Sequence, residues 1–539
     1  MSLLPRLLLS VTKRFGSEAL FKGRTERARM HCVMARCNQF LAGDFRSVFS
    51  NVMKAGAGAS TVRAVVTEKL AIAKRLSRGS KLACKGELRR AVDTLDALPP
   101  IPADSSTFDN LTGKFPSATP EPELADLLKD APAGAWGEAE WVEALGALDP
   151  SGEGNPADAL MAHIISKLPR ESGKGPSGTS FELIMAIANV DAGLVWNHVL
   201  RILLGRCPKA ARAAFASARL VAIRKKEGSS DCRPISIGEA WRRVAGKVAV
   251  LVMRGKAAAL LKTVGQWGVG VRGGTEAAVH AVRLAMQQMG PLGTDDGPVP
   301  SSAGDQLWSE KAVGTCSDPL SLNYHLALPT DVSNAFGELL RVPMFRMIRA
   351  ELPELFEVAR LFYGQDTHLW FALDDPSDDS FPLPTPTPDT AALGDAAAAV
   401  LLDIQKKYLW ILCVHGVHQG CPFGSLFFCL GVLSVVRRLL VKFPTVRIPS
   451  IADDMTLVGP QLDCVAAFIE LKAGLLEVGL KVSSPKCKAY CATKLHPETR
   501  RRLEAAGLSD TNSSFLSDGF TLCGVSVGVD ICTDDTAPV

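Results

Sequence analysis

Two adjacent aspartates, Asp453 and Asp454, carry the first chemical signal in this sequence. They stand between two β-prone stretches, 445–448 and 455–458, so we expect a hairpin with the acids at its tip. Two neighbouring carboxylates repel each other, and a divalent cation placed between them and an anionic substrate relieves the repulsion. The alternative for the pair alone is a solvated Asp-Asp turn. A third carboxylate in a matching setting would favour the metal site.

Asp331 is that third carboxylate. An apolar stretch, 324–328, leads into it and an amphipathic helical pattern, 339–352, follows, which predicts an acid at the C-terminal end of a strand. In mixed folds of helices and strands, functional sites gather at such strand ends. Between the acids, a turn rich in glycine and proline, 416–425, opens a long apolar helix, 426–441.

These three segments, in this order, resemble the palm of a reverse transcriptase, most closely those of non-LTR (LINE-like) retrotransposons. The family pattern is an aspartate followed by Ala-Phe four and five residues later, then Gln-Gly-x-Pro-x-Gly, then Ala-Asp-Asp. Each motif alone is weak, and all three in order form a strong signal. The resemblance covers roughly residues 175–530. It implies an α+β fold with the fingers and palm of a right-hand polymerase.

The resemblance also implies the reaction, which is transfer of dNTPs to the 3′-hydroxyl of a DNA primer on an RNA template. The family uses two Mg²⁺ ions about 4 Å apart, with Mn²⁺ as an alternative. Asp331 and Asp453 would bridge the two ions, and Asp454 would lie near the primer end. The backbone carbonyl of Val332 would complete the shell of one ion.

Further roles at the nucleotide follow from the same resemblance. Lys486, or less favourably Lys488, would protonate the leaving pyrophosphate as a general acid. Phe336 would stack under the sugar and exclude a 2′-hydroxyl, and the alternative for it is a core phenylalanine. Gln419 and Gly420 would support the nucleotide and the template strand.

A basic region, 201–256, contains 14 lysines and arginines against three acids, although the net charge of the chain is only +4. Such a local charge suits a phosphate backbone, and the alternative is a solvated helix surface. Helices are predicted at 182–204 and 241–261, and strands at 218–223 and 232–236.

The two predicted strands form a basic hairpin whose Arg-Pro-Ile-Ser segment matches the fingers motif of these polymerases. The resemblance implies that Arg233 contacts the phosphates of the incoming nucleotide. Lys225 and Lys226 would lie at the hairpin tip, near the same phosphates or the template. Arg233 could instead pair with a neighbouring acid, Asp231 or Glu239.

Two more turns would contact template and primer. Gln266 and Gly270 stand in a glycine-rich turn where the family has a template contact. The Gly-x-Gly of this turn is only a weak signal for dinucleotide binding, because no matching βαβ unit surrounds it. Leu522 and Gly524 stand in a turn that resembles the primer grip.

Composition divides the chain into six predicted parts. These are an N-terminal helical region (1–96), a linker with Gly/Pro-rich loops and short helices (97–180), fingers (181–290), a polar insertion (291–321), the palm (322–490, with an acidic insertion at 372–405) and the end of the palm (491–539). The thumb is expected to be largely absent. We therefore expect a truncated copy, or one part of a longer retroelement polyprotein.

The remaining expectations concern compartment and alternatives. The 14 scattered cysteines have no Cys-x-x-Cys framework, which favours a reducing, intracellular compartment, nucleus or cytoplasm. The basic segment 1–29 makes a mitochondrial transit peptide a less favoured alternative. No apolar run approaches the ~20 residues that span a bilayer. A zinc site is a minor alternative for the loosely metal-like set Cys413, His415, His418 and Cys421.

Two departures from the family leave other functions open. Pro329 stands two residues before Asp331, where a central strand should donate a hydrogen bond, so it predicts either a bent strand or a decayed copy. The first alternative is therefore a catalytically silent, nucleic-acid-binding palm. An RNA-directed RNA polymerase is less favoured, because Ala452 stands where that family has glycine before Asp-Asp.

Overall fold

The structure is a computed structural model that describes residues 101–115, 121–170, 172–225, 229, 231–287, 324–373, 408–491, 495–523 and 525–527, with the isolated positions 76, 77, 79, 80, 84 and 92. The predicted helical region 1–96 lies outside the described residues apart from those isolated positions, and so does the polar insertion 291–321. Only the first two residues of the acidic insertion 372–405 are described.

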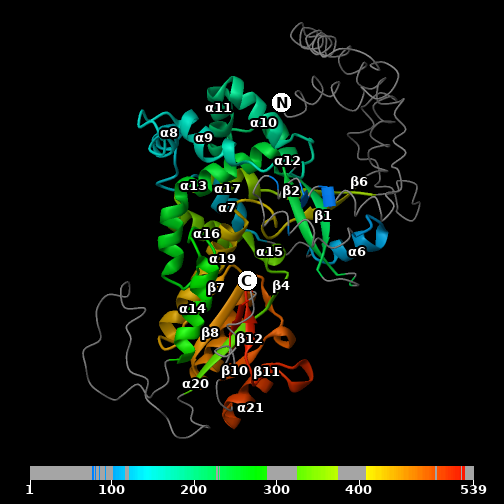
Figure 1. Cartoon of the computed structure of the whole chain (residues 1–539), viewed down its shortest axis with the longest axis vertical. Helices are drawn as coiled ribbons and strands as arrows, with labels where there is room; N and C mark the ends of the chain where they lie inside the picture. Colours follow the sequence, from blue (N-terminus) through cyan, green and yellow to red (C-terminus); the bar gives the residue numbers. More distant parts are fainter. Residues whose placement is uncertain are drawn as a thin grey trace.

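The described residues form a mixed α+β fold, as expected, with helices around two main sheets (Figure 1). The helices are α6 (Ser105–Thr112), α7 (Glu123–Lys129), α8 (Glu138–Gly146), α9 (Pro156–His163), α10 (Phe181–Val190), α11 (Ala192–Leu203), α12 (Lys209–Ala216), α13 (Ala240–Lys262), α14 (Gly274–Gln287), α15 (Ala335–Glu338), α16 (Arg341–Glu351), α17 (Phe356–Tyr363), α19 (Gly424–Lys442), α20 (Gln461–Glu477) and α21 (Pro497–Ala505). The strands are β1 (Ala218–Arg224), β2 (Cys232–Gly238), β3 (His325–Thr330), β4 (Val332–Ser333), β5 (Thr367–Ala372), β6 (Tyr408–Cys413), β7 (Ser450–Ile451), β8 (Asp454–Pro460), β9 (Lys481–Val482), β10 (Ala489–Cys491), β11 (Phe515–Leu516), β12 (Phe520–Leu522) and β13 (Val525–Val527).

The four-stranded sheet has the order β2-β1-β5-β6. β1 and β2 pair antiparallel, which confirms the hairpin predicted from 218–223 and 232–236. β5 adds in parallel to β1, and β6 pairs antiparallel with β5. On one face, Leu220 and Phe371 are buried in an apolar cluster to which α6 contributes Leu111.

The predicted linker with Gly/Pro-rich loops and short helices, 97–180, contains α6 and α7 in its first part. The polar residues that suggested a linker act as helix signals here. The side chain of Asp104 accepts a hydrogen bond from the Thr107 N–H (2.9 Å) and caps α6. The predicted helix 182–204 is likewise divided in two, because Asp191 is extended and caps α11 by accepting from the Leu194 N–H (2.8 Å). The helix predicted at 241–261 is confirmed as α13.

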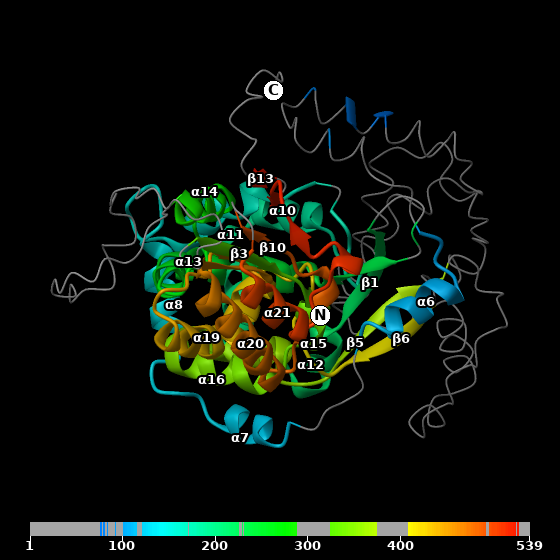
Figure 2. The same cartoon turned by 90° about the horizontal axis from the view of Figure 1, so that it is seen from below.

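The five-stranded sheet has the order β11-β10-β3-β8-β7 and lies below the helical part in Figure 1. Its side chains alternate between two cores, as the pleat requires. Leu328 and Leu457 pack in the large core that includes α19 and α20, whereas Ala327 and Val458 pack in a second core with α14 and the β12–β13 pair. Figure 2 shows α14 and β13 on one side of this sheet and α19 and α20 on the other.

Pro329 is accommodated inside β3 without ending the strand. Its carbonyl accepts a hydrogen bond from the Lys488 N–H (3.1 Å), so the backbone polar groups of position 329 face the β10 side. The ladder with β10 runs from Leu326 to Ala327 and has already ended there. The proline therefore removes one hydrogen bond beyond the end of one ladder, while the β3–β8 ladder continues through it to Thr330. The expected bend or decay is not needed to explain it.

Helix α19 is the one described helix that is long and apolar enough to cross a membrane by length and composition. The sequence pattern predicts a shorter helix, 426–441, within the same segment. In the structure, 67% of an apolar stretch of 18 residues in this helix is buried inside the protein. It packs against α16 and α20, which makes it a core helix of this fold.

Candidate functional site

The predicted acidic hairpin is confirmed as the β7–β8 pair, with Ile451 opposite Asp454. We call residues 451–454 the acidic turn. Its first strand lies later than expected, because the predicted stretch 445–448 contributes only an isolated bridge between Arg447 and Val458. Ala452 has a φ of +53°, the left-handed region that residues with a Cβ seldom occupy.

The register of β3 with β8 brings Asp331 to the same end of the sheet. Thr330 lies opposite Met455 in this antiparallel pair. Residues directly opposite in such a pair lie about 4.5–5.5 Å apart, so the next residues along, Asp331 and Asp454, are neighbours at the edge. The carbonyl of Asp331 accepts a hydrogen bond from the Ser483 N–H (2.8 Å), which ties this end of β3 to the segment after β9.

The charges of this edge are poorly compensated. Burial raises the pKa of Asp453, and the charges of Asp454 and Asp331 raise it further, to about 6. The pKa of Asp454 is raised by burial and by the charge of Asp331. The Arg233 guanidinium opposes both shifts. The fold therefore gathers three carboxylates from two segments and brings Arg233 of β2 within electrostatic reach of them.

The donor chemistry of this edge fits a hard divalent cation, since carboxylate oxygens are the preferred ligands of Mg²⁺ and Mn²⁺. Val332, whose carbonyl was predicted as a further ligand, follows Asp331 directly in β4, opposite Val482 of β9. Among the described residues, however, no three His, Cys, Asp or Glu side chains are gathered closely enough to hold a metal ion as they stand. The carboxylates share an edge but do not form a closed cage.

The zinc alternative gains no support. His415 Nδ1 lies 3.0 Å from Glu121 Oε1, and His418 Nε2 lies 3.1 Å from Thr367 Oγ1. Both histidines are buried, and burial lowers the pKa of His418. Each histidine therefore has a hydrogen-bond partner in the core. The described residues contain no His/Cys cluster of metal-binding geometry.

Lys486 lies at the edge of the acidic site. Its Nζ is 3.6 Å from Asp331 Oδ1, and the two side chains are 64% and 43% exposed. Because both groups are open to solvent, the ion pair between them is weak. Lys488, the less favoured alternative, is held elsewhere, since its Nζ donates to the carbonyls of Asn512 (3.0 Å) and Ser513 (2.9 Å).

Phe336 is half-buried in α15, and its ring stacks on Phe428 of α19 with centroids 5.1 Å apart. A Cβ at Gly424 would lie 3.6 Å from this ring, an ordinary contact, and 3.1 Å from the His418 carbonyl oxygen, which is tighter. Gln419 and Gly420 lie beside β2, because the Gln419 carbonyl accepts from the Ser236 N–H (2.8 Å). The turn before α19 is thus fastened to the strand that carries Arg233.

The basic hairpin presents its charges unevenly. Arg233 is exposed on β2. Lys225 pairs with Asp231 (2.7 Å), and so does Lys114 from the segment after α6 (2.5 Å). Burial raises the pKa of Asp231, but the hydrogen bonds from these two lysines outweigh it and lower that pKa to about 2. Lys226 lies outside the described residues.

Lys114 is a residue that the sequence did not single out. It belongs to a stretch that looked like a linker, and its partner Asp231 is 117 residues away in the chain. Its carbonyl also accepts a hydrogen bond from the side-chain amide of Asn334, three residues after Asp331. No sequence signal marks either contact. The segment after α6 therefore contacts both the basic hairpin, at Asp231, and the segment that follows Asp331, at Asn334.

Gln266 corrects an expectation, because its side chain faces into the protein and not toward a template. It is 5% exposed. Its Nε2 donates to the Ala452 carbonyl (3.0 Å), and its Oε1 accepts from the N–H groups of Ala452 (2.8 Å) and Gly268 (3.1 Å). Gly270 (φ +72°) approaches the backbone of Arg254 in α13, where a Cβ would lie 2.8 Å from the carbonyl oxygen.

The turn expected to grip the primer is also partly internal. Leu522 of β12 is 7% exposed and belongs to the second core, so its side chain is not presented to a primer. Cys523, at the turn between β12 and β13, lies near the acidic site, because the charge of Asp454 contributes to the raised pKa of its thiol after burial. Gly524 lies outside the described residues.

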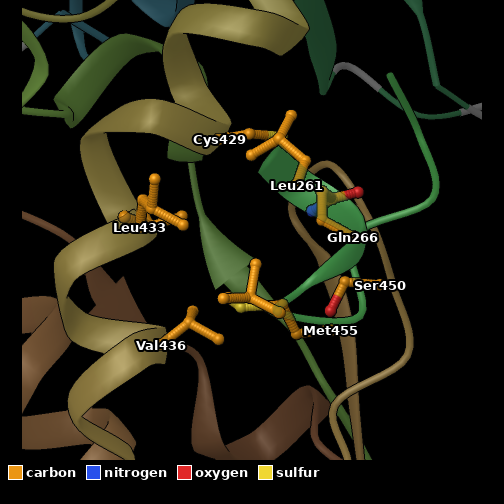
Figure 3. Close-up of a pocket in the computed structure, with 9 residues that line it drawn as sticks. Leu261, Gln266, Cys429, Leu433, Val436, Ser450 and Met455 are labelled. Atoms are coloured by element: carbon orange, nitrogen blue, oxygen red, sulfur yellow. The ribbon is translucent and has the colours of Figure 1, made fainter. Parts of the chain in front are cut away.

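A small cavity of about 10 Å³ lies beneath the acidic turn, between α13 and α19 (Figure 3). Its lining is mostly apolar, with Gln266 and Ser450 as polar members. This volume is at the lower limit for one water molecule. The cavity is therefore a packing defect behind the site and does not have the size of a nucleotide pocket.

Comparison with known proteins adds little to this geometry. No known protein family matches the chain, and no curated protein matches it. Among solved structures, it is similar to telomerase from Candida albicans in complex with the TWJ fragment of telomeric RNA, with 11% identity and a TM-score of 0.30. The match covers 60% of this chain and 45% of the telomerase chain, so less than half of that protein's length is spanned. A likeness at this level carries no argument about function.

Proposed function

We propose that this chain is an RNA-directed DNA polymerase of a retroelement, with its reaction centre at the edge that carries Asp331, Asp453 and Asp454. One observation carries the proposal. The β3–β8 register places a carboxylate that follows one strand beside a pair of carboxylates on the adjoining turn. A soluble fold gains no stability from three like charges at one edge, so a charged ligand is the physical reason to retain them.

In this proposal, Asp331 and Asp453 hold two Mg²⁺ ions, with Asp454 on the primer side and the Val332 carbonyl as a further oxygen ligand. Bound there, the ions would lower the pKa of the primer hydroxyl and stabilise the charge of the leaving pyrophosphate. Lys486 stands beside Asp331 and would deliver a proton to that leaving group.

The chain's other residues would hold the nucleotide. Arg233 is exposed on β2 and within electrostatic reach of Asp453 and Asp454, and it would bind the triphosphate. Phe336, fixed by its stacking on Phe428, would limit the space at the sugar. Gln419 would support the nucleotide from the turn before α19, where its carbonyl accepts a hydrogen bond from the Ser236 N–H of β2. These roles follow from the resemblance stated above and are supported by the positions of the side chains.

The test is primer extension by the purified chain on an RNA template with a DNA primer, Mg²⁺ and dNTPs, with EDTA and rNTP arms. We expect metal-dependent addition of deoxynucleotides. Equal use of ribonucleotides would support an RNA-directed RNA polymerase instead. Binding of template–primer without extension would support the second candidate, a catalytically silent palm. The observation that favours this candidate is the lack, among the described residues, of a ready metal-binding group of three side chains.

Charge reversal at the basic hairpin is expected to weaken template–primer binding. Lys225→Glu combined with Lys226→Glu should lower the affinity and reduce the slope of log K against log salt by about 1.5–2, since fewer counterions are released. The measurement is fluorescence anisotropy of labelled template–primer across a salt series. The matched control is Lys442→Glu with Lys472→Glu, which changes the same net charge on α19 and α20. An unaltered slope in the hairpin variant would place these lysines away from nucleic acid.

A further inference from the structure

Gln266 holds the acidic turn by its backbone. One primary amide makes two hydrogen bonds to the same residue, donating from Nε2 to the Ala452 carbonyl and accepting at Oε1 from the Ala452 N–H. The side chain is 5% exposed, so these bonds are shielded from water. Leaving a buried backbone N–H and carbonyl without partners would be costly.

The residue held in this way is the strained one. Ala452 has a φ of +53° and immediately precedes Asp453 and Asp454. An L-residue in this region costs about 1–2 kcal/mol relative to the ordinary regions. Such a conformation persists only when contacts with the surrounding structure hold it in place. Here the amide of Gln266 forms hydrogen bonds with both the N–H and the carbonyl of Ala452.

Backbone hydrogen bonds extend this attachment, which we call the clamp, from Gln266 to its two neighbours in the chain. The Trp267 N–H donates to the Ser450 carbonyl (2.9 Å), and the Ser450 N–H donates to the Gly265 carbonyl (2.9 Å). Residues 265–267 thus form a short parallel bridge along β7 (Figure 3). Gly265 is required there, because it has a φ of +75° and a Cβ would lie 2.6 Å from the Ile448 carbonyl oxygen. The bridge begins directly after α13, with the Gln266 N–H bonded to the Leu261 carbonyl (3.1 Å).

We propose that Gln266 is a positioning residue for the reaction. It fixes the backbone of Ala452 and thereby the directions in which Asp453 and Asp454 leave the turn. This inference rests on the proposed function. The amide of Gln266 is bonded to the backbone of Ala452 and Gly268, so its loss would act through the geometry of the two carboxylates. Because the segment leads out of α13, the shape of the turn is also coupled to that helix.

The test compares the wild-type chain with Gln266→Met, which keeps the length of the side chain and removes both hydrogen-bonding groups. The matched control is Gln461→Met. Gln461 is 0% exposed, accepts from the His496 N–H (3.1 Å) and follows β8 at its far end. At ~3.3 Å per residue, this position is about 20 Å from the turn. Any effect of losing a buried glutamine in general should appear in both variants.

Two readouts separate positioning from stability. Hydrogen exchange at the Ala452 amide should be about tenfold faster in Gln266→Met and unchanged in Gln461→Met, at equal global protection. Primer extension should fall about 10- to 100-fold in Gln266→Met, mainly in kcat, because a misplacement of about 1 Å has this effect. Adding Ala452→Gly should recover about fivefold, since glycine adopts the positive φ without the Cβ penalty.

If Gln266→Met does not fold, Gln266→Glu replaces it, since the carboxylate keeps the acceptor and loses the donor. Unchanged exchange at Ala452 overturns the clamp. Faster exchange with unchanged extension overturns the positioning role and leaves the proposed function standing. No rescue by Ala452→Gly also contradicts the inference. An inactive wild-type chain would instead contradict the proposed function, and the positioning role with it.

Discussion

Asp453→Asn and Asp331→Asn are each expected to reduce Mg²⁺-dependent primer extension by roughly 10³-fold or more, the scale on which loss of a key electrostatic group acts. Asparagine keeps the shape of the side chain and removes the negative charge that a divalent cation requires. Both positions lie at the edge where β3 and the acidic turn meet. The measurement is single-turnover extension at saturating template–primer.

Asp366→Asn is the matched control, because this aspartate is exposed and immediately precedes β5 of the four-stranded sheet. It should extend primers at the wild-type rate. Near-wild-type extension by either Asp331→Asn or Asp453→Asn would show that the metal assignment is wrong. Folding of each variant is checked by circular dichroism and by thermal unfolding in EDTA.

Asp453→Asn should also differ from the wild type in its free energy of unfolding when no metal is present. The pKa of Asp453 in the folded chain is raised from 3.8 to about 6, so the folded state favours the protonated carboxyl. Its contribution to stability is then greatest below pH 4 and is lost as the pH rises from about 4 to 6. At neutral pH the charge destabilises, and Asp453→Asn should be more stable by on the order of 1–2 kcal/mol.

This pH dependence is measured by chemical unfolding in EDTA between pH 4 and pH 8. The stability difference between Asp453→Asn and wild type should grow between about pH 4 and pH 6 and then stay constant up to pH 8. Mg²⁺ should reduce the difference by stabilising the wild type alone. A difference that stays constant with pH would indicate that Asp453 does not experience the repulsion of its neighbours.

Phe336→Val is expected to admit ribonucleotides. The half-buried ring is stacked on Phe428 and stands five residues after Asp331. In the proposed function, this ring would limit the space at the 2′ position of the sugar. If Phe336 has the role given to it in the proposed function, the wild-type chain should prefer dNTP over rNTP strongly. The variant should then incorporate rNTP about 10²-fold better, the scale of one steric contact in a specificity site. The measurement is single-nucleotide extension with paired dNTP and rNTP.

Phe515→Val serves as the control, since Phe515 is also half-buried but lies in β11 at the far edge of the five-stranded sheet. Its dNTP preference should match that of the wild type. If Phe336→Val keeps the wild-type preference, Phe336 is a core residue, the alternative that its partial burial leaves open. Equal use of both nucleotides by the wild type would favour RNA synthesis.

The sequence by itself determined the local elements of the site. Alternating β-branched residues placed β1 and β2, and the acidic pair between two β-prone stretches placed the β7–β8 hairpin. The long apolar run predicted α19. These predictions succeed because hydrophobic period and turn residues act over a few neighbouring positions, which the sequence displays directly.

The direction of single polar side chains was decided only by the tertiary structure. Gln266 looked like a template contact because its motif stands in a glycine-rich turn, yet its amide is buried against Ala452. A glutamine amide serves equally well on a surface or as a buried partner of backbone groups. Which use applies depends on whether another segment brings unpaired N–H and C=O groups to it.

Contacts between distant segments were likewise beyond the sequence. Lys114 meets Asp231 across 117 residues. β5 joins β1 in parallel although 142 residues lie between the end of β1 at Arg224 and the start of β5 at Thr367. Pro329 is tolerated because the β10 ladder has already ended where its N–H is missing. Each outcome depends on strand order and register, which arise from the packing of the whole core, whereas the residue types alone fix only which local structures are possible.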